Sequence, residues 1–180
     1  VKLLGQGNYA KVFLATKTEV DAEGKTTQRL VAYKIISTAD RYERMAVQQE
    51  IGILRAVRRC PYTLKIIDAS PRDGPDSPDH GDMFIITEYY NRGTLEGIMG
   101  ALCDTPRCAK RVTLLVLLQI AKALACMHSA GYVHVDLKPD NILLSAPEGN
   151  GRQPVVITSS TIKDLKFILA DYGLARRTGT

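Results

Sequence analysis

The sequence predicts an α+β fold with two lobes, the first rich in β-strands and the second helical. Three observations predict it: short β-rich runs fill residues 1–90, one amphipathic helix interrupts them, and a long apolar helix opens the second half. The chain has 180 residues, of which 45% are hydrophobic and 24% charged, as in globular domains that bury a core of their own. We expect the lobes at residues 1–90 and 91–180, with the boundary at Asn91–Gly93.

The first lobe is predicted as a set of strands around a single helix at Arg41–Val57. A glycine turn separates the first two strands, and an acidic loop rich in Pro and Gly, Pro71–Asp82, precedes the last. The expected strands are Val1–Leu4, Val12–Thr16, Leu30–Ser37, Leu64–Ala69 and Met83–Glu88. The apolar positions that the helix would bury are Met45, Ile51, Leu54 and Val57.

The second lobe is predicted around a long helix at Thr113–Ala130. This helix is apolar nearly all round, which is typical of a helix buried in a larger body. Gly131 would end it as a C-terminal cap residue. Short strands are expected at Ile142–Ser145 and Leu165–Leu169, on either side of a loop.

Composition and charge exclude several classes of protein. The formal charge of +5 is diffuse, without a basic stripe interleaved with aromatic residues, so we expect no nucleic acid partner. The longest apolar stretch, Leu114–Leu118, is too short to span a membrane. The four cysteines are too scattered for a disulfide framework, and with only three histidines a zinc site is not expected. We therefore expect a reduced protein in the cytoplasm, leave the nucleus open, and find no sign of an oligomer.

Two patterns in the first lobe indicate phosphate chemistry. Gly5 and Gly7 lie between two strands, where they permit a tight turn and a close approach of backbone N–H groups to a phosphate; an ordinary hairpin turn is the alternative. Lys34 lies in the middle of an apolar strand, where an ammonium group needs a partner. Glu50, in the helix that follows, is available as that partner; a solvent-facing lysine on an edge strand is the alternative.

The strongest pattern is His134–Asn141, directly after the long helix. Asp136, Lys138 and Asn141 concentrate a base, a cation and a metal-binding amide in one short loop. Downstream, the tripeptide Asp171-Tyr172-Gly173 follows a predicted strand, where its carboxylate can hold a magnesium ion that faces phosphates.

With these patterns in this order, the chain resembles the eukaryotic-type protein kinases from residue 1 to residue 180. The Leu-Lys-Pro-Asp-Asn form of the loop is similar to the serine/threonine branch. The resemblance implies a two-lobed kinase fold, ATP and Mg²⁺ as cofactors, and a protein Ser or Thr hydroxyl as acceptor. It also implies that Gly5–Val12 covers the ATP phosphates, and that Lys34, paired with Glu50, binds the α- and β-phosphates.

The same resemblance implies roles for the second lobe. Asp136 would accept or orient the proton of the substrate hydroxyl. Lys138 would neutralise the phosphoryl group in transfer, and Asn141 and Asp171 would hold magnesium. Phosphoryl transfer needs mainly positioning and charge neutralisation, which these side chains supply.

A nucleotide site is implied with less specificity. Thr87 would be the gatekeeper, and Glu88 and Tyr90 would offer backbone groups to adenine. The residues of the glycine loop and of the adenine slot would be Leu4, Gly5, Gln6, Gly7, Asn8, Tyr9, Ala10, Val12, Ala32 and Leu143. The apolar spine that joins the lobes would comprise Leu54, His134 and Tyr172. For each apolar residue, plain core packing is the alternative.

The sequence also departs from the family pattern. Ala10 replaces a third glycine, Tyr172 replaces a phenylalanine, and Val135 replaces the arginine that pairs with an activation-loop phosphate, which valine cannot do. Insertions are expected at 71–82 and 146–164, as surface loops.

The chain starts without Met and ends at Thr180, before the rest of the activation segment. We expect a fragment that by itself is poorly soluble and inactive on proteins, because the apolar back of the long helix would be exposed. A pseudokinase that serves as a binding or scaffolding module is the second hypothesis, and a small-molecule kinase of related fold is the third.

Overall fold

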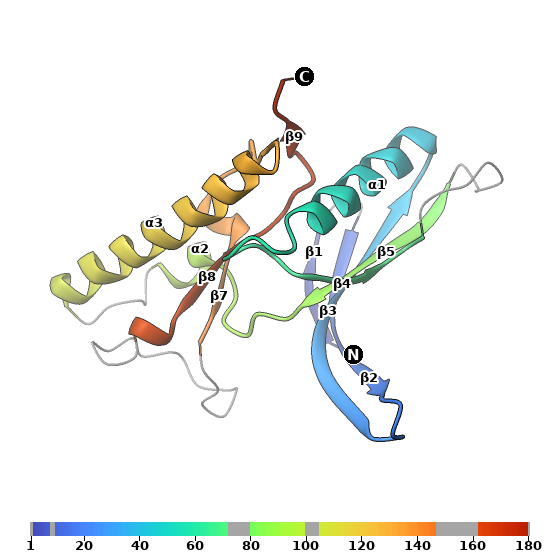
Figure 1. Cartoon of the computed structure of the whole chain (residues 1–180), viewed down its shortest axis with the longest axis horizontal. Helices are drawn as coiled ribbons and strands as arrows, with labels where there is room; N and C mark the ends of the chain where they lie inside the picture. The colour runs from blue at the N-terminus through green and yellow to red at the C-terminus, as the bar shows by residue number, and fades with distance from the viewer. Residues whose placement is uncertain (1, 8–9, 72–79, 100–104, 147–161, 180) are drawn as a thin grey trace. The chain divides into compact units, whose positions relative to one another are not determined.

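The computed structural model describes residues 2–7, 10–71, 80–99, 105–146 and 162–179 (Figure 1). They form two compact units. The first unit comprises Val1–Arg55 and Lys65–Tyr89, and the second comprises Ala56–Leu64 and Tyr90–Thr180. The loop at residues 56–64 therefore belongs to the second unit, although both of its ends continue into the first. The predicted α+β class is confirmed.

The first unit is built on a five-stranded antiparallel sheet in the order β1-β2-β3-β5-β4. In β5 every second residue is buried, namely Met83, Ile85 and Thr87, which is the pattern of a strand with one face on a core. The strands are β1 (Lys2–Gln6), β2 (Ala10–Val20), β3 (Thr26–Thr38), β4 (Ile66–Ala69) and β5 (Gly81–Glu88).

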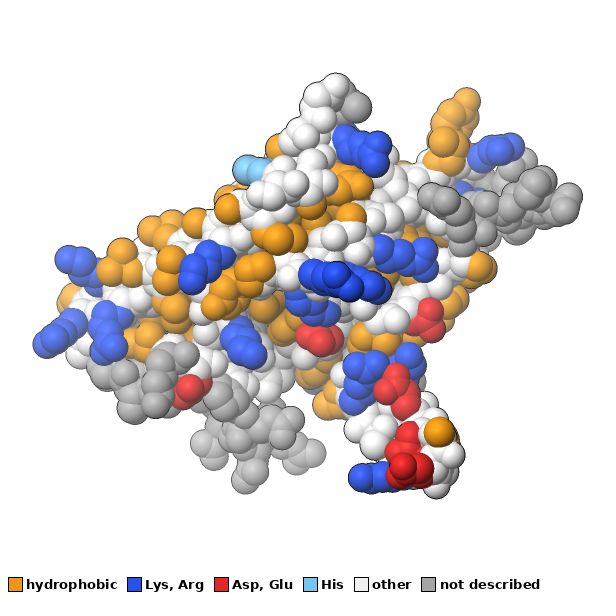
Figure 2. Space-filling model, in the orientation of Figure 1, with side chains coloured by type: hydrophobic (Ala, Val, Ile, Leu, Met, Phe, Trp, Pro, Cys, Tyr) orange, Lys and Arg blue, Asp and Glu red, His pale blue; other side chains and the backbone are white. Residues whose placement is uncertain are grey.

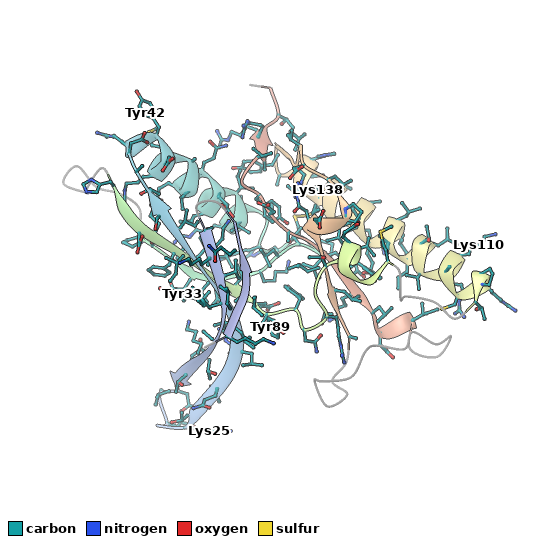
Figure 3. All side chains as sticks on the ribbon, turned by 180° about the vertical axis from the view of Figure 1, so that it is seen from behind. Lys25, Tyr33, Tyr42, Tyr89, Lys110 and Lys138 are labelled. Atoms are coloured by element: carbon teal, nitrogen blue, oxygen red, sulfur yellow. A yellow bond between two sulfur atoms is a disulfide. The ribbon has the colours of Figure 1, made fainter. Side chains whose placement is uncertain are left out.

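The hairpin of β2 and β3 extends several residues beyond both predicted strands. Its turn is closed by Asp21, whose Oδ1 accepts hydrogen bonds from the backbone N–H groups of Glu23 and Lys25. Figure 3 shows Lys25 at the tip of the hairpin. Along the strands, Glu19 pairs with Lys17 and Arg29 at 3.2 and 2.9 Å. This outer part was missed because polar cross-strand pairs, rather than apolar alternation, stabilise it.

Helix α1 (Arg41–Ala56), most of which belongs to the first unit, carries a buried apolar face. Asp40 caps the helix, because its Oδ1 accepts from Glu43 N, while Glu43 Oε2 accepts from Ala39 N. Ile51 and Leu54 are each 1% exposed, as predicted. The prediction for Met45 is wrong, since it is 60% exposed and lies off the buried stripe.

The second unit is built around helix α3 (Pro106–Ser129), which starts seven residues before the predicted Thr113. Thr105 caps its start by accepting from Cys108 N, and Pro106 occupies the first turn. At the other end Gly131 has φ 82° and donates its N–H to His128 O, so it closes the helix as predicted.

Helix α3 is not buried all round, in agreement with the expectation that its apolar back is exposed. Leu114, Leu117 and Leu118 are 58%, 61% and 53% exposed. Figure 2 shows hydrophobic side chains at the surface along this helix, between Lys and Arg side chains. By length and composition α3 is also apolar enough to cross a membrane, although its longest unbroken apolar run is only Leu114–Leu118; core helices of soluble proteins can be equally long and apolar.

Short elements complete the second unit: α2 (Leu95–Ile98), β6 (Tyr132–Val133), the 3₁₀ turns η1 (Pro139–Asn141) and η2 (Ile162–Asp164), β7 (Ile142–Ser145), β8 (Lys166–Leu169) and β9 (Arg176–Arg177). β6 pairs with β9, and β7 pairs with β8. Gln119 attaches α3 to β8: its Nε2 donates to Leu165 O at 3.0 Å and its Oε1 accepts from Phe167 N at 2.7 Å. These two hydrogen bonds fix the position of the short strand β8 along the helix axis.

The structure corrects the expectation that the cysteines are all reduced. Cys60, in the loop at 56–64, forms a disulfide with Cys126 of α3, with a Cα–Cα distance of 5.6 Å and a sequence separation of 66. Sequence spacing gave no sign of this pair, because only the fold brings the loop to the helix. Cys108 is buried and lies outside this disulfide, and Cys103 falls outside the described residues.

Candidate active site

In the first unit, the structure places the strand lysine against the helix glutamate. Lys34 Nζ of β3 donates to both carboxylate oxygens of Glu50 in α1, at 2.8 and 3.1 Å. The Glu50 side chain is 10% exposed and that of Lys34 is 28% exposed. The alternative of a solvent-facing lysine is therefore wrong. The pair joins the sheet to the helix, and the lysine side chain stays partly accessible to solvent.

The glycine turn joins β1 to β2, and Gly7 N donates to Ala10 O at 2.8 Å. A side chain at Gly5 would meet no atom within 4 Å, and one at Gly7 would meet only Ala10 O, at 3.9 Å. Neither glycine has a positive φ. The described fold therefore does not itself require glycine here, whereas close approach of a ligand to the backbone does. The space beside these two glycines leaves room for a phosphate group to approach the backbone.

Several residues of the implied nucleotide site gather on neighbouring strands of the first unit. Val12 is the partner of Lys34 across β2 and β3, and Ala32 is the partner of Thr87 across β3 and β5. Thr87 is buried, and its hydroxyl donates to Glu88 O at 3.3 Å. Leu4, Gly5 and Gln6 lie on β1, and Ala10 opens β2, whereas Asn8 and Tyr9 lie outside the described residues.

The remaining predicted residues of the adenine slot, Tyr90 and Leu143, belong to the second unit. The shared slot therefore stays a prediction, as does the spine contact of Leu54. Within the second unit, His134 and Tyr172 do make the ring contact that the spine requires, edge to face at 5.3 Å between centroids.

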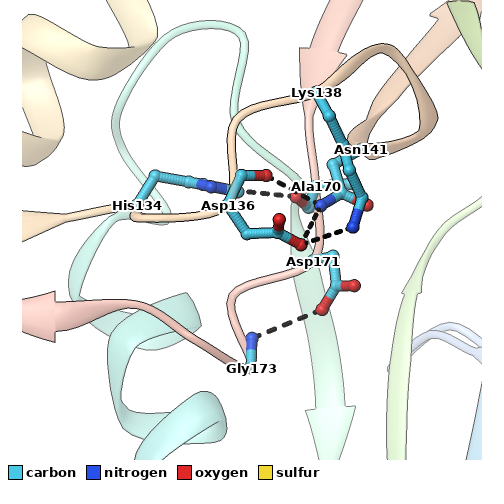
Figure 4. Close-up of polar contacts among 7 residues, drawn as sticks. All are labelled: His134, Asp136, Lys138, Asn141, Ala170, Asp171 and Gly173. Atoms are coloured by element: carbon cyan, nitrogen blue, oxygen red, sulfur yellow. Dashed lines mark hydrogen bonds and ion pairs between the residues drawn. The ribbon is translucent and has the colours of Figure 1, made fainter.

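In the second unit, Asp136, Lys138 and Asn141 converge in one loop (Figure 4). Asp136 Oδ2 accepts from Lys138 Nζ and from Asn141 Nδ2, each at 2.8 Å. The hydrogen bond from Lys138, helped by that from Asn141, holds the pKa of Asp136 below its ordinary value. The same contact raises the pKa of Lys138. The carboxylate is thus ionised and oriented at neutral pH.

The local backbone explains this convergence. Pro139 starts the 3₁₀ turn, and Asn141 N donates to Lys138 O at 3.0 Å, which brings the buried Asn141 side chain under Asp136. Asn141 Nδ2 also donates to Asp136 O at 2.9 Å. Just before, Val135 takes φ 70°, an uncommon conformation for a β-branched residue, and its side chain is 66% exposed.

Asp171 lies beside this loop because β8 is hydrogen-bonded to it. Ala170 N donates to Asn141 O at 2.8 Å, and the buried His134 donates from Nε2 to Ala170 O at 2.9 Å. Asp171 itself is exposed and has φ 60°. Its Oδ1 accepts a long hydrogen bond from Gly173 N, at 3.4 Å (Figure 4). The carboxylate is therefore little engaged by the described protein.

The donor set fits a magnesium ion. Both hydrogen bonds from the Asn141 amide nitrogen go to Asp136, so its amide oxygen is the atom that can face a cation. Together with the Asp171 carboxylate it supplies the hard oxygen ligands that Mg²⁺ prefers. Among the described residues no group of three His, Cys, Asp or Glu side chains could hold a metal by itself. The site therefore suits a cation that completes its shell with water and phosphate oxygens.

Sequence reasoning missed the support behind Asp171. The Tyr172 hydroxyl donates to Leu169 O at 2.9 Å, and Leu64 N donates to the same oxygen at 2.9 Å. Leu169 N in turn donates to Tyr62 O at 2.8 Å. The tyrosine in place of phenylalanine was the visible signal; the partners on the loop at 56–64 are too far away in the sequence to be inferred.

Comparison with known proteins agrees with this geometry. The protein kinase domain family matches residues 1–180. A probable serine/threonine-protein kinase of Dictyostelium discoideum is 27% identical over 98% of the chain and 31% of its own length. Serine/threonine-protein kinase ULK3 of Xenopus laevis is 32% identical over 79% of the chain and 27% of its length. Ribosomal protein S6 kinase alpha-2 of Homo sapiens is 30% identical over 80% of the chain and 18% of its own length.

The chain thus spans about a third or less of the length of these relatives. The family match nevertheless covers the chain from end to end, and the glycine turn, the Lys34–Glu50 pair and the Asp136 loop lie within it. The chain belongs to the protein kinase family.

Proposed function

We propose that the protein is an ATP-dependent serine/threonine protein kinase, which transfers the γ-phosphate of ATP to a protein hydroxyl. The observation that carries this proposal is the Asp136 carboxylate, which Lys138 and Asn141 hold at 2.8 Å each and whose side chain is 26% exposed. Two of the relatives described above are named serine/threonine-protein kinases, which supports the choice of acceptor.

The chain's own residues account for the positioning that phosphoryl transfer requires. Asp136 accepts or orients the proton of the acceptor hydroxyl. Lys138, already at its side, offers a positive charge to the group in transfer. Lys34, fixed by Glu50, binds phosphate oxygens, and the glycine turn offers them backbone N–H groups. ATP would supply the phosphoryl group, and Asn141 and Asp171 would hold the Mg²⁺ that neutralises charge on its phosphates.

Val135 bears on regulation. The family's arginine at this place pairs with an activation-loop phosphate, and an exposed valine has no charge with which to do so. We propose that activity does not depend on that phosphate. Phosphatase treatment of the active protein should leave its rate unchanged; a strong loss of rate would contradict this.

Location and further partners are also proposals. We keep the cytoplasm as the expected compartment, although the Cys60–Cys126 disulfide removes the argument from reduced cysteines. Neither a nucleic acid nor a membrane nor a second copy is part of the proposed function. Fractionation of cells in the presence of a thiol-trapping reagent would check the compartment and the redox state together.

The proposal is tested by phosphate transfer from labelled ATP, with Mg²⁺, to generic protein substrates. The intact protein is compared with Asp136→Asn and with Asp140→Asn, which removes an exposed carboxylate from the same loop. Loss of the base should lower the rate by at least about 100-fold, whereas the control should stay near the parent rate.

A pseudokinase is the second candidate. It would bind ATP and transfer no phosphate in either variant or parent. Transfer to sugar or lipid acceptors, with none to proteins, would instead favour a small-molecule kinase.

A further inference from the structure

The Tyr172 side chain has a bonding arrangement that phenylalanine could not have. The residue is 1% exposed, and its hydroxyl donates to Leu169 O at 2.9 Å. Burial raises its pKa well above the ordinary value, while hydrogen bonds with the Leu64 backbone and the Thr63 side chain act in the opposite direction. A buried hydroxyl with partners stabilises one arrangement, and it would be costly to bury without them.

The hydrogen bond from the Tyr172 hydroxyl to Leu169 O closes a short turn that contains Asp171, the residue expected to hold the metal. Leu169, which it binds, is the last residue of β8 and is fully buried. Two residues further on is Asp171, and then Tyr172 itself. The turn from Leu169 to Tyr172 is therefore clamped at both ends, with the Asp171 carboxylate exposed between them.

The clamp is tied to the loop at 56–64 of the second unit, which is itself held by hydrogen bonds and a disulfide. Leu169 exchanges backbone hydrogen bonds with Tyr62 and Leu64, at 2.8 and 2.9 Å. Between these two, the buried Thr63 donates from its hydroxyl to the backbone oxygens of Cys60 and Val57, at 2.9 and 3.1 Å. The Cys60–Cys126 disulfide joins the same loop to α3.

The other side of the turn carries a second restraint. The His134 ring meets the Tyr172 ring edge to face, and its Nε2 donates to Ala170 O. The tyrosine ring is thus set by packing, while its hydroxyl adds a directed bond. The bond matters for the turn because Asp171 has φ 60°, a conformation that costs free energy and needs neighbours to maintain it.

We infer that the Tyr172 hydroxyl is a positioning group: by tying its turn to Leu169 it holds the Asp171 carboxylate where a divalent cation on ATP meets it. The inference rests on the proposed function for its ligand, Mg²⁺ with ATP. It deepens that function, because it assigns a task to a residue at which this chain differs from the family pattern.

The test compares the intact protein with Tyr172→Phe, which keeps the ring and removes the hydroxyl. Tyr132→Phe is the control, since it removes a hydroxyl from a half-buried tyrosine elsewhere in the same unit. Hydrogen–deuterium exchange of residues 170–175 measures opening of the turn. Loss of one buried hydrogen bond should speed it by about two- to tenfold in Tyr172→Phe and leave the control unchanged.

A second measurement separates positioning from mere stability. The thermal shift caused by a non-hydrolysable ATP analogue is followed as Mg²⁺ is titrated. We expect Tyr172→Phe to need several-fold more Mg²⁺ for the half-maximal shift, while binding of the analogue in EDTA stays equal. Unchanged exchange would overturn the inference, and so would faster exchange with an unchanged Mg²⁺ requirement, because the hydroxyl would then be structural only.

Failure of the proposed function is distinguishable from failure of this inference. A protein that binds ATP and transfers no phosphate still reports its Mg²⁺ requirement in the thermal shift. A protein that binds no nucleotide is titrated with Mn²⁺ alone, followed by electron paramagnetic resonance. Weaker Mn²⁺ binding in Tyr172→Phe than in Tyr132→Phe supports the inference, and equal binding overturns it.

Discussion

Val135 shows how one residue can store strain in the loop that carries Asp136. Its φ of 70° disfavours a β-branched side chain, and that side chain is 66% exposed, so it has little packing to lose. Asparagine tolerates this backbone conformation much better.

We expect Val135→Asn to raise the free energy of unfolding by about 1 kcal/mol, measured by urea titration of the intact protein. Leu137→Asn is the control, since Leu137 is also exposed and has no positive φ. It should change stability by less than about 0.5 kcal/mol. Equal effects of the two substitutions would show that strain at Val135 is not the cause.

Asp136 allows a pH prediction. Hydrogen bonds from Lys138 and then Asn141 lower its pKa, so its contribution to stability is present above the unfolded pKa and lost as the pH falls through the folded pKa. Lys138→Met removes the main cause of this shift, so the pKa of Asp136 should rise towards the ordinary value for an aspartate. Carbon-13 NMR titration of the carboxyl group would measure it; a pKa that does not move would show that Lys138 is not the cause.

At the scale of elements, the Lys34–Glu50 pair joins β3 to α1. Glu50 is largely buried, so Lys34→Met would leave a carboxylate without its cation. Since Lys34 is 28% exposed and water can relax around the site, we expect a loss of about 1–3 kcal/mol in the free energy of unfolding, below the range for fully buried pairs.

The comparison that isolates this effect is Lys17→Met. Lys17 pairs with Glu19 on the exposed hairpin, and its loss should cost less than about 1 kcal/mol. In the double variant Lys34→Met/Glu50→Gln, stability should be partly regained over Lys34→Met. If it falls further by the sum of the single effects, the two side chains are not energetically coupled.

At the scale of the whole molecule, the disulfide is the largest departure from expectation. It closes a loop with a sequence separation of 66, for which the chain-entropy relation gives at most roughly 4 kcal/mol. We expect a reductant to lower the melting temperature of the intact protein but not that of Cys126→Ser. Alkylation followed by mass spectrometry should label Cys60 and Cys126 only after reduction; labelling before it would contradict the disulfide.

The sequence predicts those parts of the fold and of the site that depend on residues close together in the chain. Helix α1 and strand β5 follow from strong apolar periodicity, and the contacts of Asp136 with Lys138 and Asn141 lie within one short loop. The outer β2–β3 hairpin has no such periodicity. The bonds of Leu169 with Tyr62 and Leu64 join distant parts of the chain, and local patterns carry no information about them.

The loop at 56–64 has a consequence for synthesis. During synthesis α1 and this loop are made early, whereas the loop's partners on α3 and β8 are made much later. The nearer partner, Cys126, follows Cys60 by 66 residues. A nascent chain that has already formed the Lys34–Glu50 pair must therefore keep Cys60 and Leu64 without their partners on α3 and β8. The first unit ends at Tyr89, so all of its residues are synthesised while the loop between its two parts still awaits its partners in the second unit.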